Sequence, residues 1–263
     1  QTILFKTPYP PLYWLIMSQI PWLDHTLEFP ALSTALTDPD GLLAAGGDLS
    51  PERIIAAYKK GIFPWFSDDQ PILWWSPNPR CVVFPEKLHI SKSLKKKLNK
   101  QLFTVTFDQD FPSVIQSCAD SRGEEAGTWI TEDMLEAYIE LHHLGIAHSV
   151  EVWNDDQLVG GLYGLAIGRC FFGESMFSSE TDASKIAFVY LANQLQAWDY
   201  QIIDCQVENP HLLTLGAETI QRSEFQSILT TNIDSAPTPH QWEFSWEWFS
   251  ANTADKTVQK ESR

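Results

Sequence analysis

Hydrophobic residues repeat with two different periods along the chain, and the period changes near residue 148. Up to that point apolar residues mostly recur every third or fourth position. This pattern predicts helices at about 51–61, 91–102, 111–118 and 131–144, with one strand at 103–107. From residue 148 apolar and polar residues alternate, which predicts strands at 148–153, 158–167 and 170–174. Short turns separate these three strands, so we expect an antiparallel meander.

A further helix and strand are predicted after the meander. Residues 182–198 carry an apolar stripe with helical spacing, and residues 201–207 have the pattern of a strand. Two shorter helices are expected within 210–229, around Gly216. The order of three strands, a helix and a fourth strand resembles the acyltransferase fold of the GNAT superfamily, although a likeness of fold does not establish a function. We therefore expect an α+β protein with a mixed, mostly antiparallel sheet.

The two ends of the chain differ from the rest. Residues 1–16 are rich in proline and show no clear period, so we expect them to be disordered. Met17 is a candidate natural start, with the residues before it a tag or upstream translation. Residues 251–263 form a polar tail that is also expected to be disordered.

The strand predicted at 201–207 ends in polar residues at alternate positions. Asp204, Gln206 and Glu208 follow the apolar pair Ile202-Ile203, and side chains two residues apart on a strand share one face. Two carboxylates and an amide on one face are candidate catalytic groups. The alternative is a strand that turns polar as it reaches solvent.

Aromatic residues and prolines are interleaved in two nearby segments. These segments are Phe63-Pro64-Trp65-Phe66 and Trp74-Trp75-Ser76-Pro77. Such stretches are stiff and typical of loops. They form either a small packed core or a platform on which a base or another aromatic ligand stacks.

The chain is strongly acidic, with 18 basic and 34 acidic residues and a net charge of −16. This charge excludes a general nucleic-acid binder, because phosphate contact needs local lysine or arginine. Six lysines are nevertheless concentrated near the helix predicted at 91–102: Lys87, Lys92, Lys95, Lys96, Lys97 and Lys100. They form either a solvated face or the one local contact with a nucleic-acid backbone. The acidity elsewhere suits a cationic ligand or substrate.

Cysteine spacing and hydropathy indicate a cytoplasmic protein with no metal centre. Cys81, Cys118, Cys170 and Cys205 form no CxxC and match no zinc or iron–sulfur pattern, so they are expected to be reduced and buried. No stretch approaches the length of a transmembrane helix. The longest apolar run near the N-terminus is too short for a signal peptide.

Three kinds of chemistry are compatible with these features. An acetyltransferase that uses acyl-CoA would need a glycine-rich phosphate loop, but the segment 173–180 has no second glycine and carries two carboxylates. A hydrolase could use Glu174 and Asp204 as paired carboxylates, but that reaction leaves the lysine-rich helix unexplained. The third reaction is aminoacyl transfer from tRNA.

Six motifs support the third reaction. Together, in this order, they resemble those of the leucyl/phenylalanyl-tRNA–protein transferases, over about residues 17–250. The motifs are Gly41-Leu42-Leu43-Ala44-Ala45-Gly46-Gly47-Asp48-Leu49-Ser50, Gly61-Ile62-Phe63-Pro64-Trp65-Phe66, Trp74-Trp75-Ser76-Pro77, Gly127-Thr128-Trp129-Ile130, Phe172-Gly173-Glu174-Ser175-Met176-Phe177-Ser178 and Asp204-Cys205-Gln206.

The resemblance implies a bacterial enzyme of the N-end rule pathway. Such an enzyme moves Leu or Phe, and less readily Met, from aminoacyl-tRNA to the α-amino group of proteins that begin with Arg or Lys, and the products are degraded. It needs no metal, CoA or ATP, because the aminoacyl ester is already activated. The resemblance also implies a small N-terminal domain, at 17–81, and a GNAT-like catalytic domain, at 82–250. We expect a monomer.

The resemblance assigns roles to particular side chains. Gln206 lies beside the reacting amine, Asp204 helps to move the proton, and Glu174 holds the Gln206 amide and the donor's α-amino group. Trp65 and Trp129 stack on the terminal adenine, supported by Tyr58 and Tyr138. The six lysines contact tRNA phosphates. The amino-acid pocket is formed by Leu162, Phe171, Met176, Phe188, Leu191 and Ile203, which the pattern alone would also allow as ordinary core.

Overall fold

The structure, a computed structural model, describes residues 18–121, 130–235, 242–243 and 248. The expectations about residues 1–16, Trp129 and the tail 251–263 therefore lie outside the described residues.

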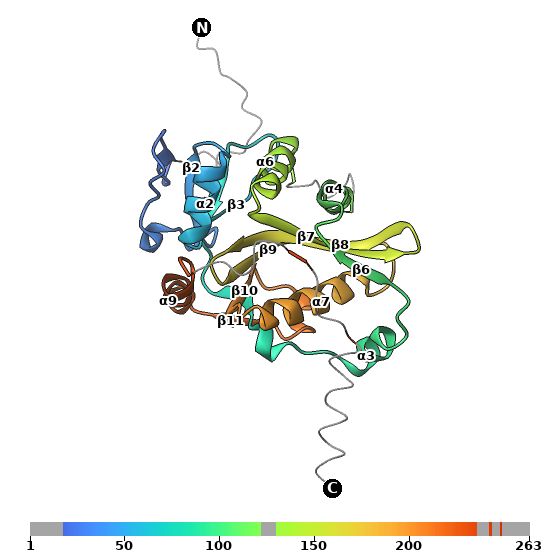
Figure 1. Cartoon of the computed structure of the whole chain (residues 1–263). Helices are drawn as coiled ribbons and strands as arrows, with labels where there is room; N and C mark the ends of the chain where they lie inside the picture. Colours follow the sequence, from blue (N-terminus) through green and yellow to red (C-terminus); the bar gives the residue numbers. More distant parts are fainter. Residues whose placement is uncertain (1–17, 122–129, 236–241, 244–247, 249–263) are drawn as a thin grey trace.

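A small four-stranded sheet forms the first part of the molecule (Figure 1), with strand order β1-β2-β4-β3. Its strands are β1 (Trp22–Leu23), β2 (Leu42–Gly46), β3 (Phe63–Pro64) and β4 (Leu73–Trp75), and a short 3-10 helix, η1 (Leu32–Thr34), lies between β1 and β2. Helix α2 (Pro51–Lys59) follows β2 and buries Ile54, Ala57 and Tyr58. Proline at the first helical position starts the helix without losing a hydrogen bond. Ser50 precedes the helix but forms no side-chain cap, because its hydroxyl donates to Asp48 instead.

A seven-stranded sheet forms the centre of the molecule, with strand order β11-β5-β10-β9-β8-β7-β6. Its strands are β5 (Arg80–Val83), β6 (Thr104–Phe107), β7 (Ala147–Asn154), β8 (Gln157–Ile167), β9 (Cys170–Ser178), β10 (Ile202–Gln206) and β11 (Glu218–Ile220). β9 and β10 are parallel, and the other paired neighbours are antiparallel. The expected meander and the mixed, mostly antiparallel sheet are therefore present.

Two strands of this sheet are not anticipated by the hydrophobic pattern, and one is longer than expected. β5 is buried at all four positions, so it has no alternation to reveal it. β11 occupies part of a segment expected to hold only two helices, which are α8 (Pro210–Leu213) and α9 (Arg222–Asn232). β9 continues to Ser178 rather than ending at Glu174, because a bulge lets its pairing with β8 continue past that residue.

Helices cover both faces of the large sheet (Figure 1). α4 (Phe111–Asp120) and α6 (Glu132–His143) pack on one face, and α7 (Ala183–Ala197) packs on the other. Two groups of buried apolar residues correspond to these two faces. The group that includes α2, α4 and α6 continues into the small sheet. The two sheets therefore share one hydrophobic core.

The lysine-rich helix is shorter than its pattern predicts. A short 3-10 helix, η2 (Pro85–Lys87), precedes it, and α3 itself spans Lys92–Leu98. Ser91 caps α3 by accepting a hydrogen bond from the Leu94 backbone N–H. Leu94 and Leu98 are buried, but Leu102 is 60% exposed. The helix predicted at 91–102 therefore ends earlier than expected, and Leu102 lies beyond it.

Candidate active site

A cavity of about 660 Å³ lies where β3, β8, β9, α7 and the end of β10 meet. All six residues expected to form an amino-acid pocket line it: Leu162, Phe171, Met176, Phe188, Leu191 and Ile203. Apart from Met176, each of them is at most 3% exposed. Their burial is thus compatible with a role in the core and in a cavity wall at once. The cavity is apolar on this side and large enough for a small apolar ligand.

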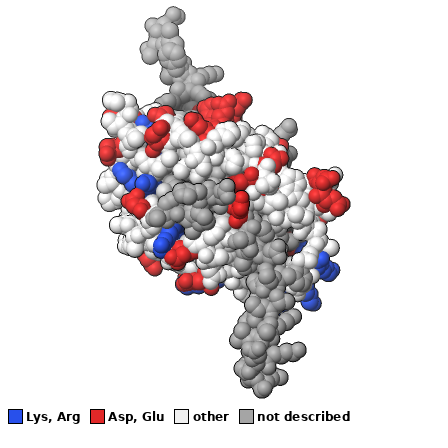
Figure 2. Space-filling view, viewed as in Figure 1, with Lys and Arg blue, Asp and Glu red and all other residues white. Residues whose placement is uncertain are grey.

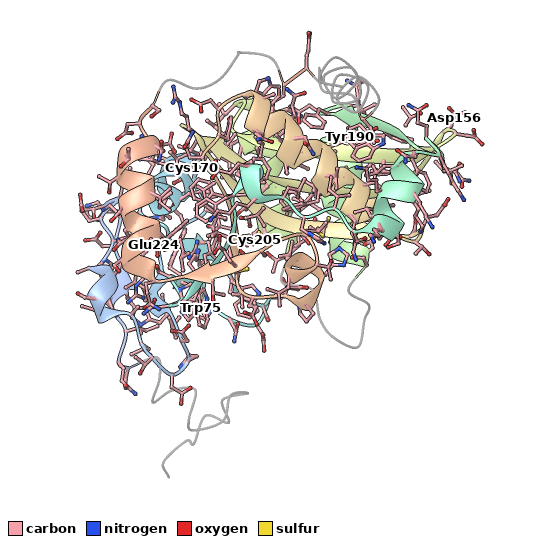
Figure 3. The ribbon with its side chains drawn as sticks, turned by 90° about the horizontal axis from the view of Figure 1, so that it is seen from below. Trp75, Asp156, Cys170, Tyr190, Cys205 and Glu224 are labelled. Carbon is pink, nitrogen blue, oxygen red and sulfur yellow. The ribbon has the colours of Figure 1, made fainter. Side chains whose placement is uncertain are left out.

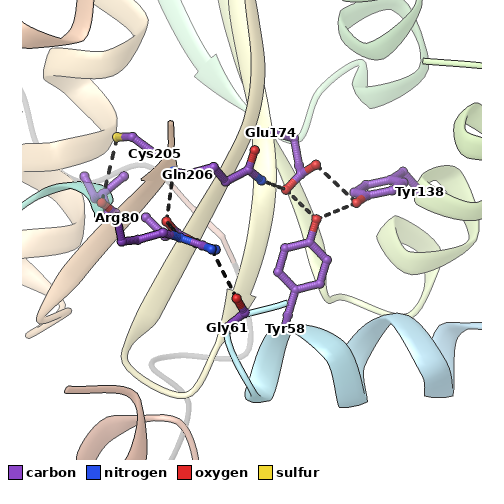
Figure 4. Close-up of polar contacts among 9 residues, drawn as sticks. Tyr58, Gly61, Arg80, Tyr138, Glu174, Cys205 and Gln206 are labelled. Carbon is purple, nitrogen blue, oxygen red and sulfur yellow. Dashed lines mark hydrogen bonds and ion pairs between the residues drawn. The ribbon is translucent and has the colours of Figure 1, made fainter. Parts of the chain in front are cut away.

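Glu174 lies at the polar side of the cavity, where a β-bulge positions it. Tyr163 pairs with Ser175 and Gly164 with Gly173, so Glu174 is the extra residue on β9. A bulge of this kind re-aims a side chain that regular alternation would place elsewhere. The Glu174 carboxyl group accepts hydrogen bonds from Tyr58, at 2.6 Å, and Tyr138, at 3.1 Å (Figure 4).

Burial dominates the ionisation of this group of side chains. It raises the pKa of Glu174 to about 8, against the effect of the two tyrosine hydrogen bonds. Burial, and next the nearby Glu174 charge, also raise the pKa values of Tyr58 and Tyr138 well above the ordinary range. The tyrosines therefore remain hydrogen-bond donors at neutral pH, while the carboxyl group can gain or lose a proton there.

Gln206 reaches Glu174 from the neighbouring strand. Its Nε2 donates to Glu174 Oε1 at 2.8 Å, as the sequence-based expectation requires. A second irregularity in the sheet, between Asp204 and Gln206, leaves Cys205 as the extra residue on β10. Gln206 itself has a φ of 62°, in the left-handed region that few non-glycine residues adopt. Consecutive residues from Cys205 to Asn209 line the cavity, so strict alternation fails at this strand end.

Asp204 does not line the cavity. It is fully buried and forms a bidentate ion pair with Arg80, with nitrogen–oxygen distances of 2.8 and 2.6 Å. The carboxylate also accepts the Gln206 backbone N–H at 2.9 Å. The expectation that Asp204 and Gln206 share one face is therefore wrong, and the reason is the bulge at Cys205. Asp204 is linked to the cavity-lining Gln206 through that residue's backbone N–H.

Arg80 is the residue that sequence reasoning missed. Its guanidinium is fully buried, donates to Gly61 O at 3.1 Å, and lies over the rings of Phe63 and Phe225. A sequence signal does exist, because Arg80 stands directly before an apolar strand just as Asp204 follows one. Two opposite charges beside buried strands are candidates for pairing.

The residues expected to stack on adenine fall into three groups. Trp65 lines the cavity, is 46% exposed and tilts against Trp75, whose Nε1 donates to Trp65 O at 2.7 Å. Tyr58 and Tyr138, which are expected to support that stacking, are both fully buried, so neither ring offers a free face to a base. Their hydroxyls bind Glu174 and each other instead. Trp129 lies outside the described residues.

The six lysines do not act as one uniform patch. Lys97 pairs with Asp182 and Lys87 with Glu218. In the described part of the chain no carboxylate pairs with the other four, which are Lys92, Lys95, Lys96 and Lys100. In Figure 2 basic side chains gather at the lower right, where α3 lies in Figure 1. Asp182 immediately precedes α7, which carries cavity residues such as Ser184. The lysine helix therefore adjoins the element that walls the cavity.

Two further searches cover the described residues only. Among them, no group of three or more histidine, cysteine, aspartate or glutamate side chains is arranged to hold a metal ion. Within the same ranges, no helix is both long and apolar enough to cross a membrane.

Known proteins show which family has these features. The family profile described as leucyl/phenylalanyl-tRNA protein transferase matches residues 82–230, and the profile of that family's N-terminal domain matches residues 47–78. A leucyl/phenylalanyl-tRNA–protein transferase of Hahella chejuensis is 58% identical over 229 residues, which cover 87% of this chain and 97% of that protein. The chain belongs to the leucyl/phenylalanyl-tRNA–protein transferase family. It is accordingly an aminoacyltransferase.

Other members of the transferase family are similarly close. The Saccharophagus degradans protein of the same name is 56% identical, covering 88% of this chain and 96% of its own length. The Pseudomonas fluorescens protein is 58% identical, and the match covers 82% of this chain and 96% of that protein. Among solved structures, "The structure of L-PGS from Bacillus licheniformis" matches with a TM-score of 0.37 and 10% identity, over 64% of this chain and 54% of that one.

Proposed function

We propose that the cavity binds the side chain of Leu or Phe, and less readily Met, while that amino acid is esterified to tRNA. The enzyme then transfers it to the α-amino group of a protein that begins with Arg or Lys, and the product is a degradation signal. One observation carries this proposal. The apolar lining of Leu162, Phe171 and their neighbours ends at Glu174 and Gln206, as a site for an apolar amino acid with a reactive carbonyl group requires.

The orientation of Gln206 defines its chemical role. Because Nε2 donates to Glu174, the side-chain carbonyl oxygen is left to accept a hydrogen bond from the attacking amine. The amine nitrogen forms a bond with the ester carbonyl carbon, and the bond from that carbon to the ribose oxygen breaks. The amine loses one proton and the ribose oxygen gains one, so the step is balanced. Much of the rate comes from holding the two substrates together.

Glu174 binds the donor's α-amino group in this proposal. It is the buried carboxyl group at the polar side of the cavity, and Tyr58 and Tyr138 hold it in one orientation. The buried pair of Arg80 and Asp204 acts as a positioning unit, because it holds the Gln206 backbone N–H. Asp204 is therefore assigned a positioning role rather than proton transfer.

The tRNA is bound by two surfaces. The exposed Trp65 ring stacks on the terminal adenine, with Trp129 as the expected second ring. The lysines on and beside α3 contact phosphates of the acceptor stem. The main contribution comes from the lysines that pair with no carboxylate in the described part of the chain. The acidic surface elsewhere attracts the cationic first residue of the acceptor protein.

The finer features of the architecture belong to the same proposal. The order of β7, β8, β9, α7 and β10, with β9 and β10 parallel, supports a GNAT-like catalytic domain at 82–250 after a small domain at 17–81. We assign the protein to the cytoplasm as a monomer. The activated ester supplies the driving force, so the reaction needs no cofactor.

A peptide transfer assay tests the proposal. Purified protein is mixed with labelled Phe-tRNA and a peptide that begins with Arg, in the absence of ATP and CoA. Labelled Phe is expected at the peptide N-terminus, and a peptide with an acetylated N-terminus serves as the control. Release of free Phe without peptide labelling, or binding of tRNA without transfer, would contradict the proposal.

A further inference from the structure

Two cysteine thiols lie side by side next to the site, and aminoacyl transfer uses neither. Cys205, labelled in Figure 3, is the bulged residue of β10 between Asp204 and Gln206. It is half-buried and lines the cavity. Cys81 lies on the adjacent antiparallel strand β5, opposite Gln206 in the register, and is fully buried. One thiol is thus reachable from the cavity, and the other lies behind it.

The two sulfur atoms are within hydrogen-bonding reach of each other. The Cys205 thiol donates to Ile203 O at 3.8 Å and lies close enough to Cys81 to donate to its sulfur instead. This contact from Cys205, more than any other group, lowers the pKa of the Cys81 thiol. The same contact, followed by burial, raises the pKa of Cys205. Cys81 is therefore the better nucleophile of the pair, and Cys205 the thiol exposed to a small reagent.

We propose that Cys81 and Cys205 form a reversible disulfide when a peroxide enters the cavity, and that this disulfide switches the transferase off. Peroxide first oxidises the Cys205 thiol to a sulfenic acid and is itself reduced to water. The Cys81 sulfur then attacks the Cys205 sulfur, and the sulfenic oxygen leaves as a second water molecule. Each disulfide thus consumes one peroxide and two thiol hydrogens.

The position of the pair explains why the disulfide would stop transfer. Gln206 follows Cys205 directly, and its amide must stay 2.8 Å from Glu174 to present its carbonyl oxygen. A covalent link shortens the sulfur–sulfur distance to about 2 Å, so the bulge must move toward β5. A displacement of about 1 Å at a reacting group can cost roughly a hundredfold in rate.

The other two cysteines provide an internal contrast. Cys118 lies on α4 and Cys170 on β9, and neither lines the cavity. Cys170 is fully buried away from the cavity, so a peroxide in the cavity does not reach that thiol. The proposal is therefore specific to one pair out of the four cysteines of the chain.

Peptide mapping of the oxidised full-length protein tests the linkage. The protein is treated with hydrogen peroxide, its remaining thiols are blocked, and it is digested without reductant. The expected product is one cross-linked peptide pair that joins Cys81 to Cys205 and separates after dithiothreitol. Because this readout does not depend on transfer, it holds even if the proposed substrates are wrong. Oxidation that leaves these peptides unlinked would overturn the proposal.

Cysteine variants test the switch itself. In the natural chain, peroxide should lower transfer by about a hundredfold, and dithiothreitol should restore it. In Cys81→Ser, and in Cys81→Ala as a check on folding, Cys205 has no resolving thiol and oxidises further, so dithiothreitol should not restore activity. Cys118→Ser is the matched control and should behave like the natural chain. Full recovery of either Cys81 variant would overturn the proposal.

Discussion

At the scale of single residues, the site depends on a buried ion pair that does not touch the cavity. Arg80 and Asp204 are both fully buried, and their pairing leaves an Asp204 oxygen to hold the Gln206 backbone N–H. Gln206 has a φ of 62°, which is unfavourable for its residue type, so it needs such an anchor. In the proposed function, the pair therefore positions Gln206 and does not exchange protons with substrate.

Substitutions in this pair separate positioning from stability. Asp204→Asn leaves the Arg80 charge buried without its partner, so the free energy of unfolding should fall by about 3–5 kcal/mol in urea titrations. The double variant Arg80→Met with Asp204→Leu removes both charges and should regain much of that stability. Transfer should remain lost in the double variant, because the Gln206 N–H has no acceptor. Recovery of transfer together with stability would contradict the positioning role.

The raised pKa of Glu174 predicts how stability depends on pH. The folded protein holds this proton up to a pH of about 8, whereas an unfolded chain releases it near pH 4. The folded state therefore binds more protons between these values, and stability falls as pH rises through that window. Glu174→Gln removes this loss and should be more stable than the natural chain at pH 8 by about 1–3 kcal/mol. Urea titrations of both proteins at pH 5 and pH 8 measure the difference in their free energies of unfolding. A difference of the same size at both pH values would contradict the raised pKa of Glu174.

At the scale of elements, two bulges decide which side chains reach the cavity. One is on β9 at Glu174 and the other on β10 at Cys205. The meander, α4, α6 and α7 follow from the spacing of apolar residues in the sequence, although β7 and β8 are buried on both faces over most of their length. A bulge has no comparable signal in the sequence. Its extra residue interrupts the alternation, but it is an ordinary amino acid and the composition of the strand is unchanged. The same limit applies to β5, whose four buried residues show no period.

The bulge on β9 depends on a glycine in β8. A Cβ atom at Gly164 would lie 2.2 Å from the Phe172 carbonyl oxygen, whereas one at Gly173 meets only Asp204 O, at 3.4 Å. Gly164→Ala should lower the free energy of unfolding by about 1–3 kcal/mol and shift Glu174. Gly173→Ala is the matched control and should change stability by less than about 1 kcal/mol. Thermal or urea unfolding measures both, and equal losses would contradict the packing argument.

At the scale of the whole molecule, charge is distributed unevenly. The chain carries a net charge of −16, yet basic side chains gather on α3 beside the start of α7 (Figure 2). Composition alone would argue against any nucleic-acid substrate. The local arrangement permits one, because phosphate contact depends on nearby charge more than on the total.

The lysines of α3 can be tested against lysines elsewhere. Lys95→Ala with Lys96→Ala should weaken tRNA binding and reduce the slope of log affinity against log salt by about 1–2. The matched control is Lys59→Ala with Lys60→Ala, because these two lysines lie on and beside α2 and pair with Asp234 and Glu28. Filter binding over a range of salt concentrations measures both slopes. If the Lys59 and Lys60 control reduced the salt slope more than the α3 variant did, the tRNA phosphates would instead contact the surface around α2.

The amino-acid sequence is sufficient to identify the family, the meander and the residues of the apolar cavity. Motifs and hydrophobic periods record which residues are present and which are buried, and Leu162 or Ile203 is buried whether it serves as core or cavity wall. The contacts of Asp204, Arg80, Tyr58 and Tyr138 become apparent only in the folded structure. Their contacts join residues 36 to 124 positions apart, through bulges that alternation does not encode. A polar group needs a protein partner when it is buried away from water. Which polar groups are buried together depends on the packed fold, so such long-range pairs depend on it too.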